Sequence, residues 1–279
     1  MNDKGLLRCP VCARPLIKTQ KTYVCEKGHS FDISSHGYVN LLTAGDKNSR
    51  FPGDDKQMAS ARHRFLSGGY YAPLAHKMER LVIYHAPPRA VIIDAGCGEG
   101  YYTSSVCAAL KEQNNAARIV GFDISKFILK YASKRAPDIE FAVASSYRMP
   151  VNDECADILI NCFSPLALEE FRRVLKPGGI FIYVVPGREH LFELKEILYD
   201  KPYENEEKET PYEGFLYESI VPVKTRFMLS SREDIADLFK MTPYYWKTPR
   251  TGRERLAEKE SLWVTAAFNI HVFKKTGEK

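Results

Sequence analysis

The chain has 279 residues, of which 44% are hydrophobic and 27% charged, as in a globular protein that can bury a core without disulfides. Its mean hydropathy is −0.32, and no run approaches the roughly 20 apolar residues of a membrane span. Because the first residues also lack an apolar signal-peptide segment, we expect a cytoplasmic protein whose seven cysteines serve as thiols or metal ligands.

The positive charge is concentrated at one end of the chain. Residues 1–68 carry 11 basic and six acidic side chains, which accounts for the whole net charge of +5. Such an asymmetry suggests that an anionic partner binds there. A small basic module with a solubility role would carry the same charge, so the charge alone does not decide between the two.

Residues 1–44 are the first predicted unit, a small zinc-binding module. Cys9 and Cys12 are separated by two residues, and Cys25 and His29 by three. Two such pairs at the tips of a short hairpin suit a tetrahedral site, and three thiolates with one imidazole favour zinc. Protein side chains fill all four positions, so the predicted role of the zinc is structural.

The rest of the chain is predicted to be a basic connector over residues 45–69, with a helix around Gln57–Leu66, and an α/β domain over residues 70–279. In that domain strand candidates alternate with helix candidates, which predicts a parallel, doubly wound sheet covered on both faces. Strands are expected at Ala90–Asp94, Ile119–Asp123, Glu140–Ala144, Ala156–Asn161 and Gly179–Val185, and helices at Tyr102–Gln113, Lys126–Ala136 and Leu166–Leu175.

The positions of proline and glycine and the hydrophobic periodicity predict the remaining elements. Lys176–Gly179, with one proline and two glycines, is expected to end a helix and turn into a strand. Tyr199–Gly214 lacks periodicity and indicates an exposed acidic loop. Two further strands are expected near Ser219–Phe227 and Ala267–Lys274, with a helix at Ser231–Lys240 between them.

A glycine-rich loop after the first of these strands indicates the chemistry. Asp94 ends the strand, and Gly96, Gly98 and Gly100 let the backbone turn tightly against a ligand. A dinucleotide fingerprint has a different glycine spacing, and the Asp94 carboxylate would repel a pyrophosphate. It suits a ligand with an amino group and a sulfonium, while Asp123 at the end of the next strand suits a ribose diol. This is the S-adenosylmethionine pattern; the alternative is a glycine turn in an α/β protein without a nucleotide.

The segment Asn161–Pro165 follows the fourth strand, at the sheet edge where doubly wound folds carry out chemistry. Phe163 could stack on an acceptor base or pack in the core. The motif of enzymes that methylate exocyclic amines is missing here. Cys162 lacks the setting of the nucleophile that C5 methylation of pyrimidines needs, so we interpret it as a buried thiol.

These residues together resemble the zinc-containing bacterial 23S rRNA guanine-N1 methyltransferases (RlmA-like) over nearly the full length. The resemblance rests on the zinc quartet, on Asp94–Thr103 and on the order of shorter motifs. These are Phe31-Asp32, Gly37–Leu42, Arg50, Pro52–Asp54, Arg62, Phe65-Leu66, Tyr71, Ala144–Ser146, Lys176–Gly179, Pro186-Gly187, His190-Leu191, Glu193–Lys195, Met241–Pro243 and Phe268–His271.

The resemblance implies a class I S-adenosylmethionine-dependent methyltransferase fold with a zinc-ribbon-like N-terminal domain. The implied activity is methylation of guanine N1 in a domain II hairpin of 23S rRNA by a homodimer with a basic cleft. It also implies that Tyr71, Gly98, Glu99 and His190 contact the cofactor. The stretch Phe163–Pro165 resembles the branch linked to macrolide response, which modifies a neighbouring guanine.

The expected reaction is an in-line displacement at the sulfonium methyl group, in which positioning and desolvation supply most of the rate. The residue that takes the N1 proton stays open; His190 and Phe163 are the candidate catalytic residues, and Arg188 and Tyr102 are weaker ones. We expect Arg50, Arg62 and Arg64 to contact RNA phosphates. Two alternatives remain, a small-molecule methyltransferase with a structural zinc ribbon and a non-catalytic RNA-binding protein that retains the fold.

Overall fold

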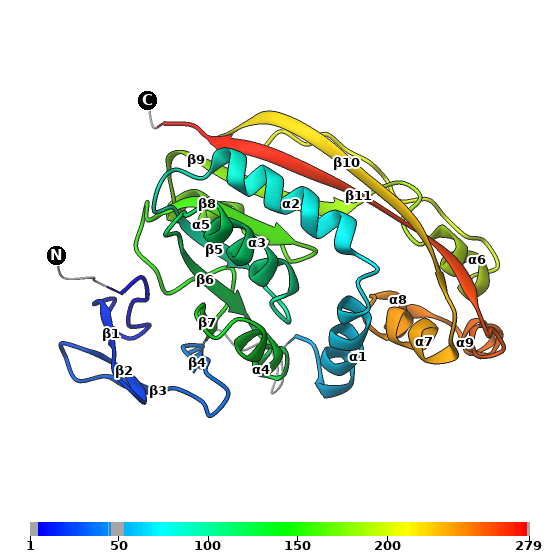
Figure 1. Ribbon diagram of the computed structural model, residues 1–279, viewed down its shortest axis with the longest axis horizontal. Helices are drawn as coiled ribbons and strands as arrows, with labels where there is room; N and C mark the ends of the chain where they lie inside the picture. The colour runs from blue at the N-terminus through cyan, green and yellow to red at the C-terminus, as the bar shows by residue number, and fades with distance from the viewer. Residues whose placement is uncertain (1–4, 44, 46–52, 278–279) are drawn as a thin grey trace.

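A computed structural model describes residues 5–43, 45 and 53–277. Its centre is an eight-stranded sheet with the order β10-β11-β9-β8-β5-β6-β7-β4 (Figure 1). Neighbours from β4 to β9 pair in parallel, and β11 is antiparallel to both β9 and β10. The strands are β4 (Val39–Asn40), β5 (Val91–Ala95), β6 (Arg118–Asp123), β7 (Glu140–Val143), β8 (Ala156–Cys162), β9 (Leu175–Pro186), β10 (Phe215–Leu229) and β11 (Leu262–Lys275).

The sheet is doubly wound, as the alternation of elements predicts. Successive side chains of a strand point to opposite faces, and the two faces belong to different hydrophobic clusters: Ile92 lies in one and Ile93 in the other. The first cluster includes residues of α2 (Ala72–His85), α3 (Tyr101–Glu112) and α4 (Lys126–Arg135). The second includes residues of α5 (Leu168–Val174) and of the N-terminal module.

The other elements lie at the ends of the sheet. A small antiparallel sheet near the N-terminus contains β1 (Leu16–Lys18), β2 (Thr22–Cys25) and β3 (Ser30–Asp32). Helix α1 (Lys56–Ser67) packs against α4 and against α7 (Arg232–Lys240). The remaining helices are α6 (Phe192–Leu198), α8 (Tyr244–Lys247) and α9 (Arg250–Ala257), which gather beside one end of the long strands β10 and β11 (Figure 1). No helix in the described residues is long and apolar enough to cross a membrane.

The predicted elements are confirmed with small shifts at their ends, apart from Lys176–Gly179. As predicted, this stretch follows the end of a helix, at Val174 of α5, and leads into a strand, but the stretch itself belongs to β9 and not to a turn. Leu175 pairs with Ala156, and regular pairing resumes only between Ile180 and Ile158. The proline and glycines therefore form an irregularity within the strand, with Gly178 at φ +76°, where glycine carries no steric cost.

The N-terminal module is joined to the large sheet by backbone pairing. Strand β4 adds a parallel edge strand beside β7, and the amide of Leu41 donates to the carbonyl oxygen of Val143 at 3.0 Å. The Tyr23 hydroxyl donates to the Glu140 carboxylate at 2.9 Å. The module and the α/β domain therefore share hydrogen bonds and one hydrophobic cluster.

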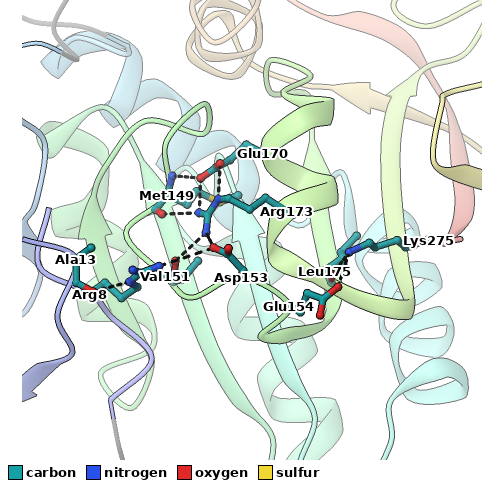
Figure 2. A network of polar contacts seen from close by, with 10 residues as sticks. All are labelled: Arg8, Ala13, Met149, Val151, Asp153, Glu154, Glu170, Arg173, Leu175 and Lys275. Atoms are coloured by element: carbon teal, nitrogen blue, oxygen red, sulfur yellow. Dashed lines mark hydrogen bonds and ion pairs between the residues drawn. The ribbon is translucent and has the colours of Figure 1, made fainter. Parts of the chain in front are cut away.

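A polar network fixes the module to the segment between β7 and β8 (Figure 2). The amide of Arg8 donates to the carbonyl oxygen of Pro150 at 2.7 Å, and its guanidinium lies 3.8 Å from Asp153. Arg173 on α5 contacts the same carboxylate at 2.5 Å, pairs with Glu170 at 2.7 Å and donates to two carbonyl oxygens of the segment. Asp153 thus connects the module to α5.

Candidate active site and metal centre

The predicted zinc ligands come together at two tight turns of the N-terminal module. Cys9 and Cys12 lie on the first turn, which ends at Ala13 with φ +58°, and Cys25 and His29 lie on the second, which contains Gly28 with φ +80°. The four ligand atoms all lie within 4.8 Å of one another.

The distances between these atoms fit a tetrahedral zinc ion. The Sγ atoms of Cys12 and Cys25 are 3.7 Å apart, and Nδ1 of His29 lies 3.4 Å from the Sγ atoms of both Cys9 and Cys25. A tetrahedron with Zn–S bonds of about 2.3 Å and Zn–N bonds of about 2.0–2.1 Å has edges of about 3.8 and 3.6 Å. The donor set and its geometry therefore match a closed structural zinc site.

The glycine-rich loop lies at the topological switch point of the sheet, between the carboxyl ends of β5 and β8, where ligands bind in such folds. Gly96 has φ +91°, and a Cβ atom there would lie 2.0 Å from Oγ of Ser164 in the loop after β8. Gly100 has φ +75° and would bring a Cβ to 3.0 Å from Ala132 of α4. Only glycine permits this tight path between the two neighbouring elements.

A cavity of about 370 Å³ opens along this loop. Most of its wall comes from the ends of β5, β6 and β8. The predicted cofactor residues that line it are Asp94, Gly96, Gly98, Glu99 and Asp123, together with Phe163. We call this the first cavity. It brings together most of the residues that are predicted to bind the cofactor.

Two carboxylates face this cavity, a buried one on Asp94 and a partly buried one on Asp123. Oδ2 of Asp94 accepts a hydrogen bond from Thr103 at 2.6 Å, whereas its buried Oδ1 has no partner among the described residues. Asp123 accepts from the amides of Gly98 at 3.0 Å and Ser125 at 2.8 Å. Desolvation raises the pKa of Asp94 to about 7 and that of Asp123 to about 6. An orphaned buried carboxylate oxygen fits the cationic end of S-adenosylmethionine, and the second carboxylate fits its ribose.

The predicted basic connector forms one wall of the cavity. Gly53, Asp54, Arg62 and Leu66 line it, and Oγ of Ser125 donates to the carbonyl oxygen of Asp54 at 2.6 Å. Helix α1 therefore covers the cofactor site. The basic charge of the connector does not predict this role.

Glu99 ties this helix to α4. Its carboxylate, which is fully buried, lies 2.6 Å from Nδ1 of His63 on α1 and 2.8 Å from the Arg135 guanidinium on α4. We call these three side chains the latch. Glu99 lines the cavity, but its carboxylate contacts His63 and Arg135, the other two side chains of the latch. No sequence pattern indicates a functional role for His63, because its partner lies 36 residues away.

A second cavity, of about 770 Å³, adjoins the first. Gly53, Asp54, Arg62, Leu66, Tyr102 and Phe163 line both cavities. Tyr71 and His190 line only the second, where the Tyr71 hydroxyl and Nδ1 of His190 are buried without a partner in the described part of the chain. Burial lowers the pKa of His190 to about 3, so its imidazole is neutral at physiological pH.

The arginines expected to contact RNA make ion pairs within the protein. Arg62 is ion-paired with Asp54 at 2.8 Å, with both side chains mostly buried, and it also donates to the carbonyl oxygen of Met241. Arg64 binds both carboxylate oxygens of Asp237 on α7, at 2.5 and 2.6 Å. Both guanidinium groups are paired with carboxylates, although the Arg64 side chain is 46% exposed, so these side chains fix α1 in place. Their contact with RNA phosphates stays a prediction. Arg50 lies outside the described residues.

Comparison with known proteins identifies the family. Residues 7–50 match the N-terminal domain model of RlmA, a zinc ribbon, and residues 88–236 match a methyltransferase domain. A putative 23S rRNA (guanine-N1)-methyltransferase of Bacillus subtilis is 33% identical over 277 residues, with 96% of each chain covered. This chain belongs to the 23S rRNA guanine-N1 methyltransferase family.

Two further relatives carry related names. The 23S rRNA (guanine(748)-N1)-methyltransferase of Streptomyces fradiae is 35% identical over 69% of this chain and 67% of its own. A putative 23S rRNA (guanine-N1)-methyltransferase of Micromonospora griseorubida is 35% identical over 69% of each chain. The predicted class I methyltransferase fold with a zinc ribbon is confirmed, and the cofactors are S-adenosylmethionine and zinc.

Proposed function

We propose that the protein methylates N1 of a guanine in a domain II hairpin of 23S rRNA. The observation that carries the proposal is the junction of two cavities: one has the carboxylates that a sulfonium cofactor needs, and the other has exposed aromatic rings. Family membership supports the choice of substrate. Guanine 748, named for the Streptomyces fradiae relative, is the position that we favour.

The residues of the first cavity would hold S-adenosylmethionine. Asp94 would face its positively charged end and Asp123 its ribose. The bound cofactor supplies the methyl group as a good electrophile. Helix α1 and the latch exclude water from the reacting atoms, so the chain contributes by positioning and desolvation. Phe163 lines both cavities, and it would contact the base that accepts the methyl group.

The zinc module would provide most of the contact with RNA phosphates. Lys18, Lys21 and Lys27 are exposed on it. A hairpin loop offers unstacked bases that a protein can read in sequence. As the resemblance implies, we propose a cytoplasmic homodimer, which light scattering of the purified protein tests. Macrolide susceptibility of a deletion strain tests the proposed link to antibiotic response.

Methyl transfer from labelled S-adenosylmethionine tests the proposal. The acceptors are unmodified 23S rRNA, the isolated domain II hairpin and a metabolite extract. We expect label in the RNA, mapped by mass spectrometry to N1 of one guanine. Label only in the metabolite extract would favour a small-molecule methyltransferase. Failure to bind S-adenosylmethionine in calorimetry would favour the non-catalytic alternative.

A further inference from the structure

The two cavities meet at a small set of shared side chains, and the methyl group must pass there. Two of these form an ion pair: Nε of Arg62 donates to Oδ2 of Asp54 at 2.8 Å, and the Asp54 side chain is 18% exposed. Asp54 is the one carboxylate among the described residues that lines both cavities. It therefore lies at the boundary between the cofactor and whatever occupies the second cavity.

Two exposed aromatic side chains line the second cavity. Phe163 is 41% exposed and Trp246 on α8 is 63% exposed. Phe163 has φ +54°, a conformation that is strained for a residue with a side chain and that concentrates at functional sites. Its ring stacks against His190 at a centroid distance of 6.3 Å, which orients one of its faces. Exposed rings in a pocket beside the reacting atom are what an extruded base stacks on.

The groups at the junction differ in their ability to accept a proton. Arg62 has no lone pair to offer. The Tyr102 hydroxyl stays protonated because burial raises its pKa well above the ordinary value. His190 lines only the second cavity, and burial lowers its pKa to about 3, so its imidazole holds a proton weakly. Asp54 remains as an acceptor, held in orientation by Arg62.

We infer, on the basis of the proposed function, that the second cavity binds the extruded guanine between Phe163 and Trp246 and that Asp54 accepts its N1 proton. In this step the bond from N1 to the methyl carbon forms as the bond from that carbon to sulfur breaks. The electron pair of the breaking bond stays on sulfur, which becomes neutral. The proton of N1 moves to an Asp54 carboxylate oxygen, so atoms and charge balance without another reactant.

Asp54→Asn tests the proton transfer, and Asp138→Asn is the matched control. Asparagine preserves the shape of the side chain at both positions, and the exposed Asp138 pairs with Lys111 and lines neither cavity. With enzyme and S-adenosylmethionine in excess, we expect Asp54→Asn to reduce the rate of methyl transfer to the hairpin about 10²- to 10⁴-fold. Asp138→Asn should stay within about threefold of the wild type. Circular dichroism and calorimetric titration with the cofactor establish that each variant folds.

The pH profile separates a catalytic role from a structural one. The wild-type rate should change little with pH around neutrality, because the protein takes up the N1 proton, whereas the Asp54→Asn rate should keep rising with pH, because N1 must then lose its proton to the solvent. A structural defect would lower the rate equally at every pH. A rate within threefold of the wild type, or a parallel profile, would overturn the assignment of Asp54.

Tryptophan fluorescence tests the binding cavity. The chain has two tryptophans, so Trp263→Phe leaves Trp246 as the single reporter. In the presence of S-adenosylhomocysteine, the hairpin should quench Trp246, and a hairpin with an abasic site at the target should not. Trp246→Ala should weaken hairpin binding about 10- to 100-fold, as expected for loss of one stacked ring. Unchanged fluorescence at saturating hairpin would refute stacking.

The failure of this inference differs from failure of the proposed function. If wild-type protein transfers no methyl group to guanine N1, the proposed function is wrong. If the wild-type protein does transfer the methyl group, two results would show that only the inference is wrong. The first is an Asp54→Asn rate equal to that of the wild type, and the second is Trp246 fluorescence that the hairpin quenches no more than the abasic hairpin does.

Discussion

The most informative single residue is Asp94. Its Oδ1 is buried and has no partner in the described ranges, although such a group ordinarily costs about 1–3 kcal/mol. Burial raises its pKa to about 7. A buried carboxylate with an unpartnered oxygen is suited to bind a cation, because a positive charge beside it would stabilise the ionised form. Cofactor binding and the ionisation of Asp94 are therefore coupled.

This coupling predicts that S-adenosylmethionine binds more weakly as the pH falls. Below about pH 7 Asp94 is increasingly protonated in the free protein, and the bound cation requires the carboxylate. The dissociation constant should rise by up to tenfold per pH unit between pH 7 and pH 6, and binding should release a proton. Calorimetry in buffers of different ionisation enthalpy measures both effects. Asp94→Asn should bind weakly at pH 8 with little pH dependence, and equal affinity of the wild type at pH 6 and pH 8 would contradict the coupling.

At the scale of elements, local patterns predict the βα units and the zinc turns, because each depends on residues close in sequence. Helix α2 is not among the elements predicted from the sequence. Its buried apolar residues Leu74, Met78 and Val82 are nevertheless spaced four residues apart, as on one face of a helix. Strand β4 has two residues, so only its pairing with β7 identifies it. The covering role of α1 depends on Asp54, Arg62 and the latch, whose contacts bridge distant parts of the chain. Spacing in the sequence carries no such information, and it does not indicate that Trp246 and Phe163 line the same cavity.

The contacts of the latch predict how substitutions change the free energy of unfolding, and the direction depends on whether Glu99 keeps its charge. Arg135→Met should destabilise the protein by about 3–5 kcal/mol, because it leaves Glu99 buried without its guanidinium. The double variant Arg135→Met with Glu99→Gln should be more stable than Arg135→Met alone, because the uncompensated charge is gone. Urea unfolding measures both. Arg250→Met, which breaks the exposed pair with Glu254, is the control and should cost less than about 1 kcal/mol.

For the molecule as a whole, the architecture divides two tasks between parts that are packed together. The zinc module shares a sheet edge and a hydrophobic cluster with the methyltransferase domain, and Asp153 connects it to α5 (Figure 2). None of the described residues of the zinc module lines the cofactor cavity. The module can therefore hold RNA in a fixed position relative to the methyl group without taking part in cofactor binding.

This division predicts that RNA affinity and cofactor affinity can be changed separately. Replacing Lys18, Lys21 and Lys27 with glutamine should weaken binding of the hairpin and lower the slope of log affinity against log salt by about 0.7–0.9 for each phosphate that is no longer neutralised. The dissociation constant for S-adenosylmethionine should stay unchanged. The control replaces three exposed lysines of the C-terminal half, Lys201, Lys208 and Lys259, and so removes the same charge. Filter binding across a salt series measures the slope. An equal decrease in both triple variants would mean that net charge, rather than the zinc module, holds the RNA.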